Sequence, residues 1–216
     1  MAALSVEAVR QNLAAVRERI EVAAARAGRD GAEVEILVAV KYVGVEDIET
    51  LADAGVTLVG ENRAQDLLAK VQRAPGRLRW HFIGALQSRK VRLIVPHVEL
   101  IHSVATESVL RELGRHAPDG FEILVEVNVS GEEGKAGIAP AELDAFIARA
   151  PVTVAGLMTM PPLAADSQRS RPYFARLARL ARERGLRTLS MGTSQDFEVA
   201  VEEGATIVRI GTTIVA

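Results

Sequence analysis

VEILVAVK, residues 34–41, is the stretch from which the fold of this chain can be worked out. Six of its eight residues are apolar, and the run is rich in β-branched side chains and too short to span a membrane. We therefore predict a strand that is buried on both faces, as in a parallel sheet. Its last residue, Lys41, is either the point where the strand meets solvent or a nucleophile at the mouth of a site.

Similar apolar segments recur along the chain and alternate with helical ones. The expected strands are 34–41, 56–60, 78–85, 98–104, 121–130, 152–158, 187–191 and 205–211, and the expected helices are 6–20, 45–55, 62–74, 86–95, 105–116, 139–150, 167–185 and 194–204. This alternation predicts an α/β protein, a single (β/α)8 TIM barrel over residues 1–216, with a doubly wound open sheet as the alternative. Few residues follow the last strand, so we expect the helix over 6–20 to complete the outer ring.

The composition excludes several classes of protein. The chain has 216 residues, no cysteine and a net charge of −2. The lack of cysteine excludes disulfides and thiolate sites and fits a reducing compartment, and the charge gives no reason to expect binding to nucleic acid or membranes. The four histidines (His81, His97, His102 and His116) lack the spacing of a zinc site, so we expect no metal. With no apolar signal core, we expect a cytoplasmic protein, and we expect it to be a monomer.

Polar residues gather at the carboxyl ends of the predicted strands, where a (β/α)8 barrel carries its chemistry. These ends are 41, 60–62, 84, 103, 128–130, 158–160, 192–194 and 211–212. MGTS at 191–194 and IGT at 210–212 combine glycine with hydroxyl groups, and the first precedes a predicted helix, which favours a phosphate. Because strands seven, eight and one are neighbours in a closed barrel, Ser194, Gly211 and Thr212 should lie near Lys41. The alternative is that Ser194 and Asn62 are only helix N-caps.

Arg209 is unexpected within its strand. The segment 205–211 (ATIVRIG) is apolar apart from Thr206 and this arginine. A buried guanidinium needs a partner, which is either a structural carboxylate or a ligand atom that accepts a hydrogen bond. We interpret two other buried-strand residues, Trp80 and His81 in WHFIG, as a packing tryptophan and a satisfied core histidine.

The order of motifs along the chain identifies a resemblance. AVK, GENRAQDLLAK, WHFIGALQSRK, NVSGEEGKAGI, GLMTM and LSMGTSQDFEVAVEEGATIVRIGT, between residues 34 and 213, resemble the pyridoxal phosphate homeostasis proteins, which are similar to the barrel domain of alanine racemases. The resemblance implies pyridoxal 5′-phosphate bound as a Schiff base to Lys41. It also implies a phosphate near Ser194, Gly211 and Thr212, a pyridine nitrogen facing Arg209, and a pocket lined by Asn62 and Met158.

Three positions depart from the pattern that the resemblance implies. Val40 stands where serine or threonine is usual, and Thr193 stands where methionine is frequent. The chain ends in TTIVA, whereas the family usually continues to a Gly-x-Arg ending. These departures concern contacts around the cofactor, and none of them changes the lysine.

The resemblance implies a protein that holds, buffers or delivers pyridoxal phosphate to dependent apo-enzymes, rather than an enzyme. Arginine can only donate, so it leaves the pyridine nitrogen unprotonated, whereas strong carbanion chemistry needs that nitrogen protonated. The alternative is a pyridoxal-phosphate-dependent amino-acid racemase or a related fold-type III enzyme, but only Tyr42 and Tyr173 are available as a second tyrosine acid/base. A cofactor-free lysine aldolase would explain Lys41 but not the phosphate-type loops.

Overall fold

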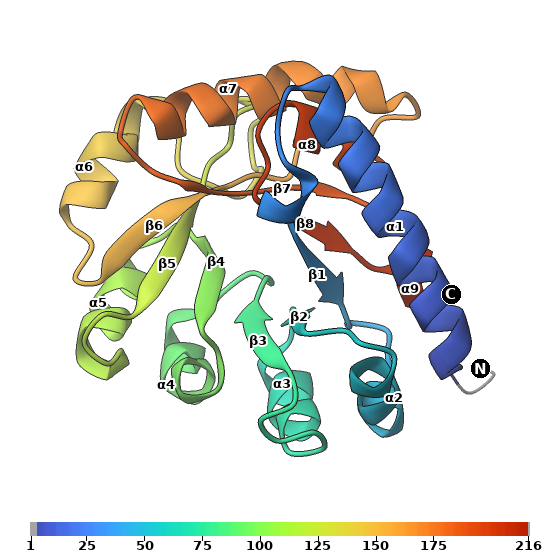
Figure 1. The fold of residues 1–216 in the computed structure, drawn as a ribbon. Helices are drawn as coiled ribbons and strands as arrows, with labels where there is room; N and C mark the ends of the chain where they lie inside the picture. Colours follow the sequence, from blue (N-terminus) through green and yellow to red (C-terminus); the bar gives the residue numbers. More distant parts are fainter. Residues whose placement is uncertain (1–3, 216) are drawn as a thin grey trace.

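Eight parallel strands form a closed barrel in the computed structural model, which describes residues 4–215 (Figure 1). Each strand pairs with its neighbour in the sequence, and the last strand returns to pair with the first. The strands are β1 (Glu35–Ala39), β2 (Leu58–Glu61), β3 (Arg79–Phe82), β4 (Leu100–Val104), β5 (Glu122–Glu126), β6 (Thr153–Met158), β7 (Thr188–Thr193) and β8 (Ile207–Ile210). The predicted (β/α)8 barrel is confirmed, and the open sheet is excluded.

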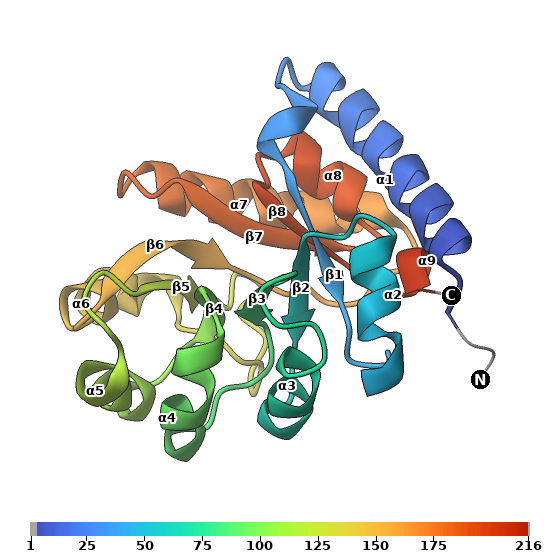
Figure 2. The ribbon, with the colours of Figure 1, turned by 60° about the horizontal axis from the view of Figure 1, so that its bottom comes forward.

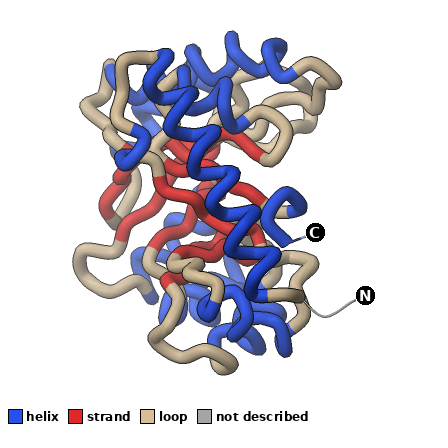
Figure 3. The backbone as a smooth tube through the Cα atoms, turned by 45° about the vertical axis from the view of Figure 1, so that its right-hand side comes forward, coloured by secondary structure: helices blue, strands red, loops and turns tan. Residues whose placement is uncertain are grey.

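Helices surround the strands on all sides of the barrel, as Figures 2 and 3 show from two further directions. They are α1 (Val6–Arg26), α2 (Ile48–Asp53), α3 (Ala64–Val71), α4 (Val91–Ile94), α5 (Glu107–His116), α6 (Leu143–Ala148), α7 (Arg171–Arg182), α8 (Phe197–Glu202) and α9 (Thr212–Val215). Their apolar faces and the outer face of the sheet form the larger hydrophobic core. Between residues 4 and 215, no helix is both long and apolar enough to cross a membrane.

The inside of the barrel is filled by side chains from alternate strand positions. An apolar layer is formed by Leu37, Leu58, Leu100, Leu124, Met158 and Ile207. Gly60 belongs to the same interior, since a Cβ atom there would lie only 2.4 Å from the side chain of Leu37. The alternation continues toward the carboxyl ends, so that Lys41, Glu126 and Arg209 have the same orientation as the interior residues that precede them on their strands. These three side chains reach the mouth of the barrel.

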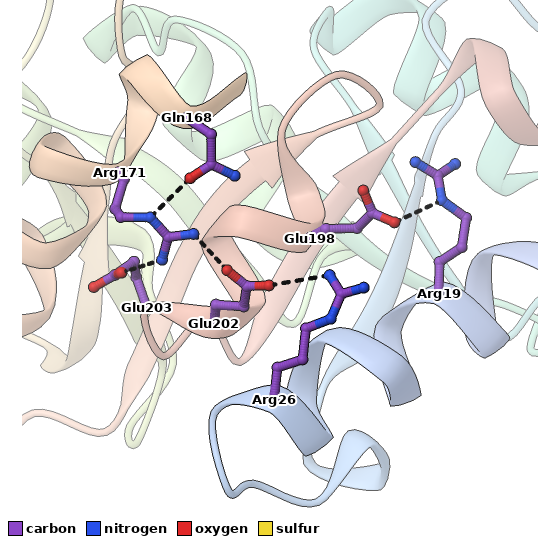
Figure 4. A network of polar contacts seen from close by, with 7 residues as sticks. All are labelled: Arg19, Arg26, Gln168, Arg171, Glu198, Glu202 and Glu203. Carbon is purple, nitrogen blue, oxygen red and sulfur yellow. Dashed lines mark hydrogen bonds and ion pairs between the residues drawn. The ribbon is translucent and has the colours of Figure 1, made fainter. Parts of the chain in front are cut away.

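Helix α1 fills the gap in the outer ring, as predicted. It packs against α8 and against α9, a single helical turn that is too short to cover the barrel alone (Figures 1 and 2). Two ion pairs join it to α8: Arg19 lies 3.0 Å from Glu198, and Arg26 lies 3.5 Å from Glu202 (Figure 4). The first helix of the sequence therefore closes the ring after the last strand.

Candidate functional site

A cavity of about 440 Å³ opens at the carboxyl ends of the strands. All seven residues predicted for the site line it: Lys41, Asn62, Met158, Ser194, Arg209, Gly211 and Thr212. Two cavities of similar volume lie elsewhere, one between α1 and the first two strands (about 470 Å³) and one at the amino ends of the strands (about 460 Å³). Neither of these is lined by a lysine. The cavity at the carboxyl ends is therefore the candidate site.

Lys41 lies at the mouth of this cavity, two residues beyond the end of β1. Its side chain is exposed, and its Nζ atom lies 4.8 Å from the centroid of the Tyr42 ring. The backbone just before it is fixed, because Val40 donates its N–H to the carbonyl of Gly60 (3.0 Å) and accepts from Lys70 Nζ (2.7 Å). The strand end therefore meets solvent, and the same lysine lines the cavity; its role as a nucleophile stays a prediction.

A buried ion pair between Glu61 and Lys70 holds the strand ends next to Lys41. Glu61 and Lys70 are 0% and 3% exposed, and Lys70 Nζ lies 2.5 Å from a carboxylate oxygen of Glu61. The other oxygen of Glu61 accepts the N–H groups of the two residues that follow it, at 2.6 and 3.2 Å. The pair therefore ties the end of β1 to the end of β2. Lys70 was not predicted from the sequence, although it follows Leu67 by three residues on the buried face of α3.

Asn62 lines the cavity, and its side chain carries an unsatisfied acceptor that is buried in the protein. Its Oδ1 atom is buried and has no hydrogen-bond partner among the described residues. A buried polar atom without a partner costs about 1–3 kcal/mol of stability. The N-cap alternative fails for this residue, because α3 begins at Ala64 and Asn62 makes no capping bond to it.

The two loops predicted to bind an anion lie side by side at the cavity. The N–H group of Gly211 donates to Ser194 Oγ over 3.3 Å. Gly192, the second-last residue of β7, has a φ of +89°, and a Cβ atom there would lie 2.9 Å from Phe197 Cα, so this strand end requires glycine. The helix predicted over 194–204 begins only at Phe197 and is six residues long. Hydroxyl and backbone N–H groups of the loops, rather than the end of a long helix, therefore line this side of the cavity.

Two departures from the expected pattern have local structural roles. Val40 is fully buried in the hydrophobic core and does not line the cavity. Thr193 lines the cavity, but its hydroxyl donates to Asp196 Oδ1 (3.0 Å), which also accepts its N–H (2.8 Å). The third departure, the ending that would follow Ala216, lies outside the described residues.

Arg209 is buried inside the barrel and is held by neutral acceptors. One terminal nitrogen, Nη1, donates to Ser190 Oγ (2.5 Å), and the other, Nη2, donates to the Thr159 carbonyl (3.0 Å) and to Met160 Sδ (2.9 Å). No carboxylate of residues 4–215 forms an ion pair with it. Burial lowers the pKa of Arg209 to about 10, against the opposing effect of the Glu126 and Asp196 charges. The guanidinium is therefore protonated at neutral pH, and the structural-carboxylate interpretation is wrong.

Glu126, at the end of β5, is a cavity residue that the sequence analysis missed. Burial raises the pKa of its carboxyl group, while the Arg209 charge partly opposes this. The apolar run suggested that the strand continues to residue 130, but it ends at Glu126 and the segment after it is a loop. In that loop, Asn128 accepts the N–H of Gly131 (3.0 Å) instead of lining the cavity. The signal for Glu126 was its spacing of two from the interior residue Leu124.

The remaining sequence interpretations concern the strand WHFIG. Trp80 and His81 are 5% and 2% exposed, and His81 Nδ1 lies 3.0 Å from His102 Nε2. They are a packing tryptophan and a hydrogen-bonded core histidine, as predicted. Within residues 4–215 no three histidine, aspartate or glutamate side chains gather in a way that could hold a metal ion.

Comparisons with known proteins identify relatives of this chain. No protein-family model matches the chain. The pyridoxal phosphate homeostasis protein of Aquifex aeolicus is 43% identical, over 94% of this chain and 95% of that protein, and the one of Pseudomonas aeruginosa is 39% identical, over 95% and 94%. PipY of Synechococcus elongatus, solved with pyridoxal phosphate bound, is 29% identical with a TM-score of 0.80, covering 96% of this chain and all of that one. An arginine decarboxylase of a Chlorella virus shares the fold alone (TM-score 0.72, 12% identity, covering 99% of this chain and 64% of that one).

Proposed function

This chain belongs to the pyridoxal phosphate homeostasis protein family, and we propose that it binds pyridoxal 5′-phosphate in the cavity at the carboxyl ends of its strands. The observation that carries the proposal is the meeting of a lysine, an arginine and two hydroxyl-bearing loops in that one cavity. A phosphorylated pyridine aldehyde needs these three groups: an amine for the aldehyde, a donor for the ring nitrogen and an anion-binding loop for the phosphate. Its role is to hold, buffer and deliver this cofactor.

The cavity suits the cofactor in size and in chemistry. Its volume of about 440 Å³ lies within the ordinary range of small-molecule sites. The N–H of Gly211 has only a long bond to Ser194 that a phosphate oxygen can replace. The apolar side chain of Met158 adds a surface on which a flat ring can lie.

Each residue has a distinct task toward this ligand. When bound, the cofactor supplies an aldehyde carbon to which the Lys41 amine becomes covalently linked with loss of water. Ser194, Gly211 and Thr212 bind the phosphate with hydroxyl and N–H groups. Arg209 donates to the ring nitrogen, and the ion pair of Glu61 with Lys70 holds the mouth in place.

Holding the cofactor is favoured over catalysis with it. Arg209, whose pKa is about 10, keeps its protons at neutral pH and has no lone pair to offer. A ring nitrogen that accepts from it therefore stays unprotonated, which makes the cofactor a poor electron sink. We therefore expect the protein and the cofactor to form a tight complex that reacts slowly.

Replacing Arg209 tests the proposal. In Arg209→Gln we expect pyridoxal phosphate binding to weaken at least about tenfold, the scale of a lost charged hydrogen bond, with a shifted absorption band. Cofactor titration by absorbance, combined with melting of the apo-protein, separates binding from folding. Unchanged affinity and spectrum together with a large fall in apo-protein stability would make Arg209 structural.

Glu126 supports one second candidate, a slow racemase or related activity. Its carboxyl group lines the same cavity as Lys41, so a second proton acceptor is available there. Incubation of the cofactor-loaded protein with L-alanine, followed by chiral chromatography, tests it. Robust racemisation that is abolished by both Lys41→Ala and Glu126→Gln would replace the carrier function.

The recipients of the cofactor are proposed to be pyridoxal-phosphate-dependent apo-enzymes, and the carrier is proposed to act as a monomer. The support is the exposure of Lys41, which leaves the covalent link open to attack by an incoming amine. Mixing the loaded protein with an apo-aminotransferase should restore that enzyme's activity faster than spontaneous release of the cofactor allows. Restoration no faster than release would limit the protein to storage.

A further inference from the structure

A chain of hydrogen bonds runs through the barrel from the cavity at the carboxyl ends to the cavity at the amino ends. Arg209 donates to Ser190 Oγ, which lies 2.8 Å from His102 Nδ1. His102 Nε2 in turn lies 3.0 Å from His81 Nδ1. Ser190 and His102 are completely buried, and His81 is 2% exposed. These three residues, which we term the polar column, cross an interior that is otherwise apolar.

The direction of every bond in the polar column follows from Arg209. A guanidinium donates and cannot accept, so the Ser190 hydroxyl must send its own proton elsewhere. Ser190 has no solvent contact, and the only other partner of its oxygen in the described part of the chain is His102 Nδ1. His102 Nδ1 is therefore the acceptor, and the proton of this ring sits on Nε2, which donates to His81 Nδ1. The proton of His81 then sits on its own Nε2.

The protonation of the two histidines agrees with this arrangement. Burial lowers the pKa of His81 to about 3, with a further contribution from the Arg79 charge. Burial also lowers the pKa of His102 well below its ordinary value, and the neighbouring His81 and Arg209 add to the effect. Both rings are neutral near pH 7, and each has one donor and one acceptor to offer.

The far end of the polar column lies at the opposite mouth of the barrel. His81 lines the cavity at the amino ends of the strands and takes no part in lining the cofactor cavity. Beside it Arg79 is paired with Glu35 (2.6 Å) and with Glu99 (2.8 Å). A substitution at His81 is thus remote from any cofactor and removes no contact with it.

At the near end, the polar column determines how Arg209 is presented. Its three protein bonds use three of the five N–H donors of a guanidinium. The acceptors are a hydroxyl, a carbonyl and a thioether, so none of them neutralises the charge. The remaining N–H donors of Arg209 belong to a guanidinium that lines the cavity and has no carboxylate in contact with it.

We infer that Ser190, His102 and His81 are positioning residues that fix Arg209 through a one-way chain of neutral hydrogen bonds, so that its remaining donors face the cofactor. This inference rests on the proposed function. The hydrogen bond from Arg209 to the ring nitrogen of the cofactor then depends on residues that do not touch the cofactor. A substitution at His81, in the cavity at the amino ends of the strands, therefore alters cofactor binding at the carboxyl ends.

Two substitutions at His81 form a matched pair. His81→Leu keeps the volume of the side chain but offers no acceptor to His102, whereas His81→Asn keeps an acceptor at the position of Nδ1. We expect His81→Leu to weaken pyridoxal phosphate binding roughly three- to tenfold, the size of one hydrogen bond, and to shift the absorption band of the bound cofactor. His81→Asn should stay within about twofold of the parent. The substitution His97→Leu, at an exposed histidine, is the control and should change neither quantity.

The positions of the ring protons are measured separately, by long-range proton–nitrogen correlation spectra of the full chain labelled with ¹⁵N in histidine. His81 and His102 should both appear as neutral rings protonated on Nε2, with or without cofactor. Parent-like affinity and spectrum in folded His81→Leu, or His102 protonated on Nδ1 in the parent, would overturn the inference. If His81→Leu does not fold, the ring-proton measurement on the parent decides. Failure of the parent to bind pyridoxal phosphate would instead refute the proposed function.

Discussion

Two arginines of this molecule are held in opposite ways. Arg171, at the start of α7, contacts the carboxylates of Glu202 and Glu203 (2.6 Å to the latter) and the side chain of Gln168 (Figure 4). Hydrogen bonds to Glu202 and Glu203 raise the pKa of Arg171 above its ordinary value. Arg209, inside the barrel, contacts only neutral acceptors, and burial lowers its pKa to about 10.

The difference is that the charge of Arg171 is paired with carboxylates, whereas the charge of Arg209 has no contacting carboxylate and is available to the proposed ligand. In the outer network the charge of Arg171 is neutralised by carboxylates. Arg171 fixes α7 on α8 through Glu202, and Arg26 fixes α1 on α8 through the same glutamate. In the barrel the charge is retained without a contacting counter-ion, at a cost in desolvation that the fold must bear. We propose that a phosphorylated aldehyde ligand uses this cation, which lines the same cavity as Lys41 and the two hydroxyl-bearing loops.

The largest effect on stability should come from breaking the buried ion pair beside the site. Lys70→Met leaves the carboxylate of Glu61 unpaired at 0% exposure. We expect a loss of about 3–5 kcal/mol in the free energy of unfolding, measured by urea denaturation of the apo-protein. A loss below about 1 kcal/mol would mean that the Glu61–Lys70 pair contributes no more than an exposed ion pair, and would contradict the difference in energy expected between buried and exposed charges.

As the pH falls, the buried histidine His81 should reduce the free energy of unfolding before the carboxylates of the Arg171 ion pairs are protonated. His81 has an ordinary pKa of 6.5 when unfolded and about 3 when folded, so the unfolded chain takes up the proton first. Stability is therefore complete above pH 6.5 and falls as the pH drops, by about 2 kcal/mol at pH 5 from this residue alone. Urea midpoints at pH 7.5 and pH 5 measure it, and His81→Asn should flatten the dependence. A parent protein equally stable at both values would contradict the neutral polar column.

A smaller effect is expected in the outer network. Arg171→Met should cost about 1 kcal/mol or less, because its partners Glu202 and Glu203 keep access to water. The loss should shrink further in 0.5 M salt, which screens exposed ion pairs but leaves buried ones nearly unchanged. Pyridoxal phosphate affinity should not change in this variant. A cofactor-binding defect here would show that the outer network also serves the site.

The alternation of the strands explains why so much was predictable from the sequence. Apolar runs such as 34–41, separated by helical stretches, predicted eight strands, and closing them into a barrel brings residues 41, 194 and 209–212 to one mouth. Local pattern is enough for this, because the side-chain direction repeats every second residue along a strand. The predicted strand ends were less accurate, and Glu126 was missed because apolar residues continue beyond it.

The contacts within the polar column could not be predicted from the sequence pattern of single strands. His102 and Ser190 are 88 residues apart in the sequence, and each reads as an isolated polar residue in an apolar strand. Their contact depends on the curvature of the closed sheet and on the strand register, which shifts between β4 and β5 and between β7 and β8. Lys70 was hidden for a similar reason, since a lysine on a helix is ordinarily solvent-exposed.

We propose that Lys41 is the covalent attachment point for pyridoxal phosphate, and borohydride reduction of the loaded protein tests this assignment. The protein is loaded with the cofactor, reduced with borohydride, and analysed by intact mass and by peptide mapping. We expect one pyridoxyl phosphate per chain, located on the peptide that contains Lys41, and no stable label in Lys41→Ala. Label found mainly on another lysine, such as Lys90 or Lys135, or equal labelling of the parent and Lys41→Ala, would contradict the account.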